Sequence, residues 1–154
     1  MGLGWSVHKN DGWRGQFERV HRWRIRLLEA TRSKSPDLED FAYAFFQNCY
    51  HLREWIEKTS SCPQSELDAL MATSAPLRLC RDIANGTKHR TLQHASVDTD
   101  FSIGREYAPD EPAGYRLFLI ADDKYDLIDL SRMCISAWTV FIEEKGAMFG
   151  SRKE

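Results

Sequence analysis

Apolar residues recur at a helical period in two long segments of the N-terminal half of the chain. The first stripe predicts a helix that runs to about Thr31; its members are Trp13, Phe17, Val20 and Leu27. The second predicts a helix that lasts to about residues 59–61; its members are Phe41, Phe45, Cys49, Leu52 and Ile56. Ser35-Pro36-Asp37 predicts the start of this second helix, because serine caps free backbone N–H groups and proline suits the first helical position.

Proline residues divide the next part of the chain. Pro63 and Pro76 predict a short helix at 64–72 and another that begins near 75, so that residues 12–90 are helical. A final helix is expected at 126–146, with the apolar stripe Leu127, Leu130, Cys134, Ala137 and Phe141. Residues 147–154 are expected to form a flexible tail.

Between the last two helices the apolar period changes to two. A first strand would direct one set of side chains to the same face: Val97, Thr99, Phe101 and Ile103. A loop at 105–114 and a second strand at 115–121, running into a polar turn at 122–124, complete a hairpin across 96–121. The sequence therefore predicts a mainly α fold, a helical bundle of about five helices with a small β-hairpin between the fourth and last helices.

Length and composition are those of one folded unit. The chain has 154 residues, of which 42% are hydrophobic and 29% charged, with a formal net charge of −2. These values exclude the low-hydrophobicity, high-charge signature of a disordered chain. We expect a single helical domain spanning 1–154. The N-terminal segment lacks a secretory signal, and the longest apolar stretch, 135–142, is far too short to cross a bilayer, so a cytoplasmic protein without a membrane partner is predicted.

The cysteines are scattered along the sequence, at Cys49, Cys62, Cys80 and Cys134. They form no Cys-x-x-Cys pair and no spacing typical of a zinc site. Reduced thiols in or near the core are therefore expected, with no metal site and no cofactor.

Charge is unevenly distributed. Residues 13–34 carry only Glu18 and Glu29 against a run of cations: Arg14, Arg19, Arg22, Arg24, Arg26, Arg32 and Lys34. Residues 98–129 are predominantly acidic. The basic face could bind RNA phosphates, with Arg19, Arg22 and Arg26 as contacts. Equally, it could be a solvated surface, or the two segments could attract each other within the fold or across a dimer.

One segment, Arg81-Asp82-Ile83-Ala84-Asn85-Gly86-Thr87-Lys88-His89, contains a combination of residues that could carry chemistry. Two interpretations are open. Asn85-Gly86 could end the helix, leaving Lys88, His89 and Arg90 as cations near its negative end. Alternatively the helix continues through Gly86, and Arg81, Asn85 and His89 then form one row at i, i+4 and i+8, with Lys88 beside it.

Such a row suits the cleavage of RNA. Arginine is a permanent cation, and imidazole exchanges a proton near neutral pH. RNA supplies its own nucleophile, the 2′-hydroxyl, so cleavage without a metal needs mainly an acid or base and a cation on the phosphate. Lys88 and Arg90 would add phosphate contacts, and Asp82 could orient the arginine or the histidine.

A helical bundle with an arginine, a polar residue directly after it and a histidine on a later helix resembles the HEPN superfamily, many of whose members are metal-independent ribonucleases or toxins in prokaryotic conflict systems. The resemblance implies a homodimer whose two motifs face each other across a cleft. It assigns Arg81 as the motif arginine, Asp82 as the polar residue and His89 as the motif histidine. The spacer from Asp82 to Lys88 is longer than is usual in that family.

The expected function is therefore a metal-independent endoribonuclease acting on RNA as a toxin or defence-system component. The alternative is a catalytically silent helical interaction module with a protein partner, such as an antitoxin or a subunit of a larger prokaryotic defence assembly. A nucleotide-binding domain ranks last, because the chain has no glycine-rich phosphate loop.

Overall fold

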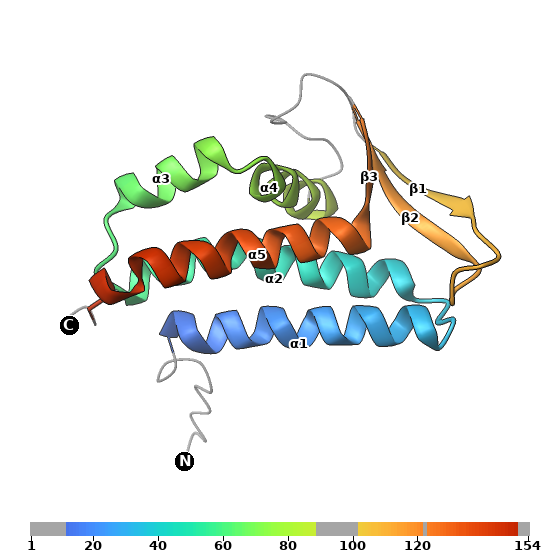
Figure 1. Ribbon diagram of the computed structural model, residues 1–154, viewed down its shortest axis with the longest axis horizontal. Coiled ribbons are helices and arrows are strands. Elements are labelled where there is room, and N and C mark those ends of the chain that lie inside the picture. Colours follow the sequence, from blue (N-terminus) through green and yellow to red (C-terminus); the bar gives the residue numbers. More distant parts are fainter. Residues whose placement is uncertain (1–11, 89–101, 122, 151–154) are drawn as a thin grey trace, which may run out of the picture.

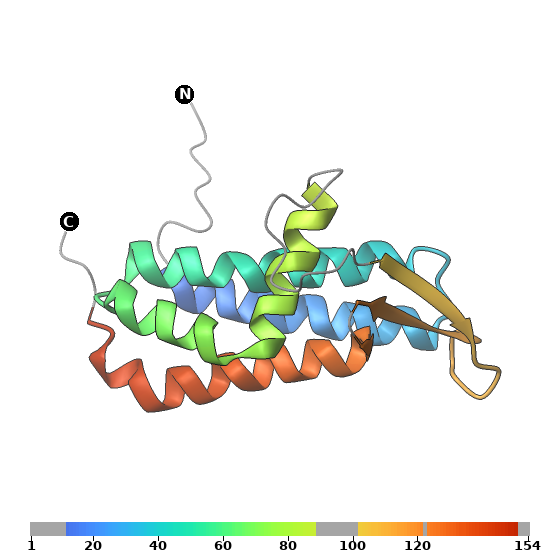
Figure 2. The same cartoon turned by 90° about the horizontal axis from the view of Figure 1, so that it is seen from above.

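The computed structural model describes residues 12–88, 102–121 and 123–150, and in this part of the chain the helices form three layers (Figure 1). Helix α1 (Gly12–Arg32) forms one outer layer, and α2 (Leu38–Thr59) lies with α5 (Leu127–Lys145) in the middle. Helices α3 (Gln64–Thr73) and α4 (Ala75–Lys88) form the other outer layer, where α4 crosses above α2 and α5 (Figure 2). The predicted mainly α bundle is confirmed.

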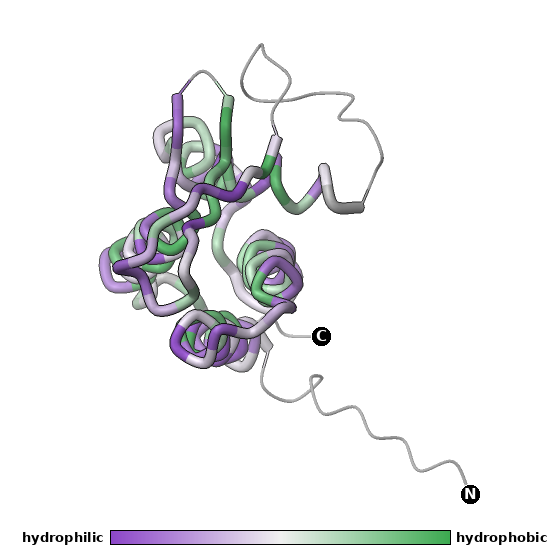
Figure 3. The backbone as a smooth tube through the Cα atoms, turned by 90° about the vertical axis from the view of Figure 1, so that its right-hand side faces the viewer, coloured by the Kyte–Doolittle hydropathy of each residue, from purple (hydrophilic) through white to green (hydrophobic). Residues whose placement is uncertain are grey.

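The core forms where the predicted stripes meet. The large side chains with less than 2% exposure include Leu27 from α1, Phe45 from α2, Ile83 from α4 and Trp138 from α5. Each helix alternates apolar and polar stretches along its length (Figure 3), as helices with one buried face do. None of the helices in the described ranges is long and apolar enough to cross a membrane.

The ends of α1 and α2 are joined by side-chain contacts. The backbone N–H of Trp13 donates to Thr59 Oγ1 over 2.9 Å, so the last residue of α2 satisfies a free donor at the first turn of α1.

Helix α2 begins at Leu38, later than its sequence signal predicts. Pro36 lies in the preceding turn instead of the first helical position, and Ser35 Oγ accepts from the backbone N–H of Asp37 at 3.2 Å.

The hairpin is present and is larger than predicted. Strands β1 (Ser102–Tyr107), β2 (Tyr115–Ile120) and β3 (Lys124–Asp126) form an antiparallel sheet in that order. The predicted loop at 105–114 is wrong for its first three residues, which pair with β2, and the predicted turn at 122–124 leads into a third strand. The strand residues expected at 97–101 lie outside the described part of the chain.

The expected flexible tail is wrong for its first residues. A 3₁₀ turn at Gly146–Met148 follows α5, and Phe149 is 5% exposed. Its ring lies 5.6 Å from that of Trp13 and 5.7 Å from that of Phe141, between centroids. The aromatic side chain buries enough apolar area to hold the segment against the bundle. Residues 151–154 lie outside the described residues.

Candidate functional site

Helix α4 continues through Gly86 and reaches Lys88. The interpretation in which Asn85-Gly86 ends the helix is therefore wrong. An unbroken helix keeps Arg81 and Asn85 on one face, one turn apart. The last turn of α4 extends beyond α2, on the side away from α5 (Figure 2).

The apolar face of α4 is what fixes its position. Leu77, Cys80, Ile83 and Ala84 are all at most 5% exposed. At the start of the helix, Arg78 NH1 donates to the carbonyl oxygens of Met71 and Ala72, at 3.1 and 2.6 Å. The guanidinium thereby satisfies carbonyls at the end of α3, which lack partners within their own helix. Arg78 has a structural role.

Asp82 is buried, which the sequence did not indicate. Its side chain is 1% exposed, although a carboxylate is rarely buried without a charged or hydrogen-bonding partner. Arg81 Nε lies 3.7 Å from Asp82 Oδ1, and the arginine side chain remains 30% exposed. The buried carboxylate of Asp82 therefore lies beside the guanidinium of Arg81, whose side chain remains partly exposed.

The remaining motif residues follow toward the end of α4. Asn85 and Gly86 are half-buried, and Lys88 is the last helical residue. His89 and Arg90 lie outside the described residues. The described part of the site thus offers a partly exposed guanidinium beside a buried carboxylate and, one turn later, a carboxamide that donates and accepts hydrogen bonds. This pair can bind a phosphodiester, and proton transfer would have to come from His89.

The basic face of α1 is not part of this site. Helix α1 packs on α2 and α5, whereas α4 lies in the opposite outer layer (Figure 1). Arg22 and Arg26 are exposed, and the Arg26 guanidinium lies 4.7 Å above the Trp23 ring. Arg19 NH1 donates to Gln16 Oε1 at 2.8 Å. The α1 arginines and the α4 motif therefore belong to two separate surfaces.

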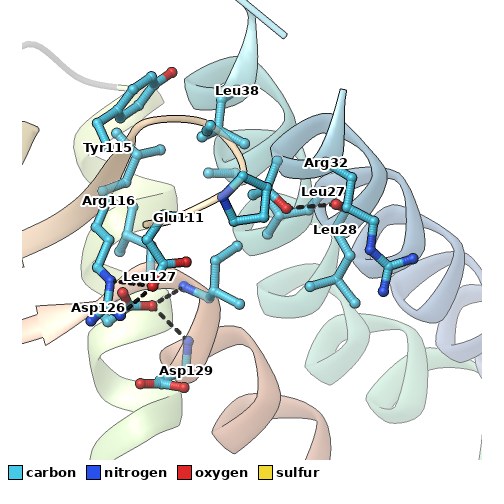
Figure 4. Close-up of a pocket in the computed structure, with 16 residues that line it drawn as sticks. Leu27, Leu28, Arg32, Leu38, Glu111, Tyr115, Arg116, Asp126, Leu127 and Asp129 are labelled. Atoms are coloured by element: carbon cyan, nitrogen blue, oxygen red, sulfur yellow. Dashed lines mark hydrogen bonds and ion pairs between the residues drawn. The ribbon is translucent and has the colours of Figure 1, made fainter. Parts of the chain in front are cut away.

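A cavity of about 280 Å³ lies where the end of α1, the start of α2, the sheet and the start of α5 meet (Figure 4). Arg32 lines it together with the acidic residues Glu111, Asp126 and Asp129. Asp126 Oδ1 accepts the backbone N–H groups of Ile128 and Asp129, which caps α5, and Arg116 pairs with Glu111. The end of the basic helix thus faces acidic residues within the fold. These polar groups have mutual structural roles, so the cavity is a weaker candidate site.

Three of the four cysteines meet in the core, which sequence reasoning missed. The sulfur atoms of Cys49, Cys80 and Cys134 lie within 4.8 Å of one another, and all three residues are at most 1% exposed. Burial raises the pKa of Cys80 and Cys134 well above the ordinary thiol value. Cys80 Sγ donates to the carbonyl oxygen of Phe46 at 3.3 Å and Cys134 Sγ to that of Pro76 at 3.4 Å. The proximity of the Cys134 and Cys80 thiols lowers the pKa of Cys49 to about 5. The four cysteines are free and buried, as expected for core thiols, and three of them, although far apart in the sequence, lie together in the fold.

A scan against models of protein families, a search of curated proteins and a search of solved structures each find no match for this chain.

Proposed function

We propose that this protein is a HEPN-like, metal-independent endoribonuclease that acts in the cytoplasm as a homodimer, in the role of a toxin or defence-system component. The observation that carries the proposal is the unbroken course of α4 through Gly86, with Arg81 held beside the buried carboxylate of Asp82. The row of motif residues requires that helix. If the helix ended at Gly86, the motif residues before and after Gly86 would not share one helix face, and the proposal would have no geometric basis.

Each motif residue has a distinct role in the proposed reaction. Arg81 and Lys88 bind the scissile phosphate and stabilise the charge that develops on it. Asp82 acts as a positioning residue, because its buried side chain lies beside Arg81 and is not exposed to substrate. Asn85 hydrogen-bonds the phosphate or orients His89, and Arg90 adds a phosphate contact.

The chemistry is an internal transfer at phosphorus. The 2′-oxygen loses its proton to a base and forms a bond to phosphorus, while the bond from phosphorus to the 5′-oxygen breaks. The leaving 5′-oxygen takes up a proton, so the products are a 2′,3′-cyclic phosphate and a free 5′-hydroxyl. His89 supplies one or both proton transfers, the second being available from the partner motif in the homodimer.

The direct test is incubation of purified protein with a mixed RNA substrate in the presence of EDTA. We expect cleavage that leaves cyclic phosphate ends, and loss of cleavage in His89→Ala and in Arg81→Ala. Arg116→Ala is the matched control, because that arginine pairs with Glu111 at the sheet and should leave the rate unchanged. RNA that stays intact with a folded, dimeric preparation would contradict the proposal.

A second candidate function is the catalytically silent interaction module, and one observation favours it. A shallow groove of about 440 Å³ runs along α5 and the end of α3, lined by Leu70, Met133 and Val140. Met133 is 40% and Val140 50% exposed. Arg132 and Glu144 lie at opposite ends of this stretch of α5. In an antiparallel pair of α5 helices related by a two-fold axis, each arginine would face the other copy's glutamate.

The two candidates predict different mutational patterns, because the groove lies along α5, whereas the end of α4 extends beyond α2, on the side away from α5 (Figure 2). If the protein is a silent module that pairs through this groove, Val140→Glu converts a dimer into a monomer, whereas Arg81→Ala has no effect. Sedimentation velocity measures the first result and the RNA assay the second. A dimer that survives Val140→Glu excludes the groove as its interface.

A further inference from the structure

The cluster of three cysteines brings together three helices that are far apart in the sequence. Cys49 lies near the middle of α2, Cys80 on the first half of α4 and Cys134 on α5. Helix α4 crosses above α2 and α5 (Figure 2), and the three cysteines are buried together between these helices. The three sulfur atoms lie within 4.8 Å of one another, and all three residues are buried. They form a set of possible metal ligands that are all thiols.

The spacing of the sulfur atoms suits a single metal ion. A thiolate binds Zn²⁺ at about 2.3 Å, so two sulfur atoms on one ion are roughly 4 Å apart. The three sulfur atoms are within 4.8 Å of one another, and each therefore needs to move by less than about 1 Å. Thiolates are soft ligands that select zinc and Cu(I) over the hard cations magnesium and calcium.

Trp138 supplies a second, independent observation. It lies one turn after Cys134 on α5 and is 1% exposed. Its indole Nε1–H is buried and has no hydrogen-bond partner among the described residues, although buried indole N–H groups usually have one. A metal-bound thiolate is an acceptor that this donor would satisfy, as hydrogen bonds to metal ligands commonly do.

We propose that Cys49, Cys80 and Cys134 form a buried three-thiolate site for one soft, thiophilic cation, Zn²⁺ or Cu⁺, with the buried Trp138 Nε1–H donating to a metal-bound sulfur. The cation offsets the charge of thiolates that a dry core would otherwise disfavour. Because the ligands come from α2, α4 and α5, the bound ion cross-links the helix that carries Arg81 to the rest of the core. The site is structural and separate from the proposed RNA chemistry.

The test uses intact protein purified anaerobically, under reducing conditions, from cells grown with added zinc or added copper. We expect one metal ion per chain by elemental analysis, and the medium that yields it identifies the cation. Exchange with Cd²⁺ should give thiolate-to-metal charge-transfer absorption in the ultraviolet. Protein that carries neither metal and shows no such absorption with Cd²⁺ overturns the proposal.

Variants separate the site from nonspecific metal binding. Cys80→Ala should abolish the Cd²⁺ absorption, whereas Cys62→Ala should keep it, because Cys62 is the buried cysteine outside the cluster. Trp138→Phe keeps the sulfur ligands and should weaken binding by about 10–100-fold, the usual loss when a ligand's hydrogen-bond partner is removed. Circular dichroism confirms that each variant is folded. Equal absorption in Cys80→Ala and Cys62→Ala overturns the proposal.

Discussion

The basic face of α1 and the end of α4 both carry arginine, but the surroundings of the arginine side chains differ between the two surfaces. On α1, Arg22 and Arg26 are exposed, and the Arg26 guanidinium lies over the flat face of Trp23 in its own helix. On α4, Arg81 lies beside a carboxylate that is 1% exposed. The many cations on α1 favour long-range attraction of RNA phosphates. The Arg81 guanidinium on α4, which lies beside a buried carboxylate, favours one defined geometry of the bound phosphate.

The largest expected difference between the two surfaces is in the rate of RNA cleavage. Arg81→Ala should lower kcat by about 100–1000-fold, the usual loss when a donor to developing charge is removed. Arg22→Ala should change kcat by less than about threefold, because an exposed phosphate contact contributes mainly to binding. Single-turnover kinetics with saturating enzyme measures both. Equal losses in the two variants would mean that the surfaces do not differ in this way.

Asp82→Asn sharpens the comparison, because it keeps the size of the buried side chain and removes its charge. The guanidinium of Arg81 then loses the carboxylate at 3.7 Å. We expect a roughly 10–100-fold lower kcat with little change in KM, since a misplaced catalytic group costs about this much. The matched control is Asp68→Asn, which removes the exposed partner of Arg53. A thermal scan of each variant separates lost positioning from lost folding.

A combined Arg19→Gln, Arg22→Gln, Arg26→Gln variant tests what the α1 surface contributes. If these side chains contact RNA phosphates, affinity should fall and its dependence on salt should become less steep, by about 0.7 in log–log slope for each lost contact. Fluorescence anisotropy with a labelled single-stranded RNA at several salt concentrations measures the slope. An unchanged slope would mean that the α1 arginines form a solvated surface and do not contact RNA phosphates.

The smallest effect is expected at Gly86. Since Gly86 is inside α4 and is not a left-handed helix end, Gly86→Ala should raise the free energy of unfolding by about 0.5–1 kcal/mol. At a left-handed stop the same substitution would be destabilising. Urea denaturation gives the sign. A stabilised variant with full RNA cleavage would link the continuous helix to the proposed site.

The helices could be predicted because the periodic pattern of apolar residues that specifies each helix lies within its own segment of the sequence. The stripe from Phe41 to Ile56 repeats over several turns, and four of its five members are fully buried in α2. Strand β3 was missed because its three residues show no period, and Phe149 was missed because a single aromatic residue after a helix does not reveal its contacts. Trp138 lies beside the predicted α5 stripe and is more buried than its predicted neighbour Ala137.

The candidate site was predictable in composition and only partly in geometry. The residue types from Arg81 to His89 indicated phosphate chemistry, but the sequence left open whether Gly86 ends the helix. The burial of Asp82 depends on where α4 crosses the middle layer, which no local pattern contains. The cysteine cluster depends on the same crossing, because Cys49, Cys80 and Cys134 are separated by tens of residues.

The position of α5 has a consequence for synthesis of the chain. This last long helix contacts α1, α2, α4 and the sheet, and its Trp138 fills the centre of the core. While the ribosome is still adding Leu127–Lys145, the apolar faces of the earlier helices have no complete partner. Folding of the bundle therefore finishes only after α5 has emerged from the ribosome. Until then the nascent protein exposes apolar surface that chaperones recognise.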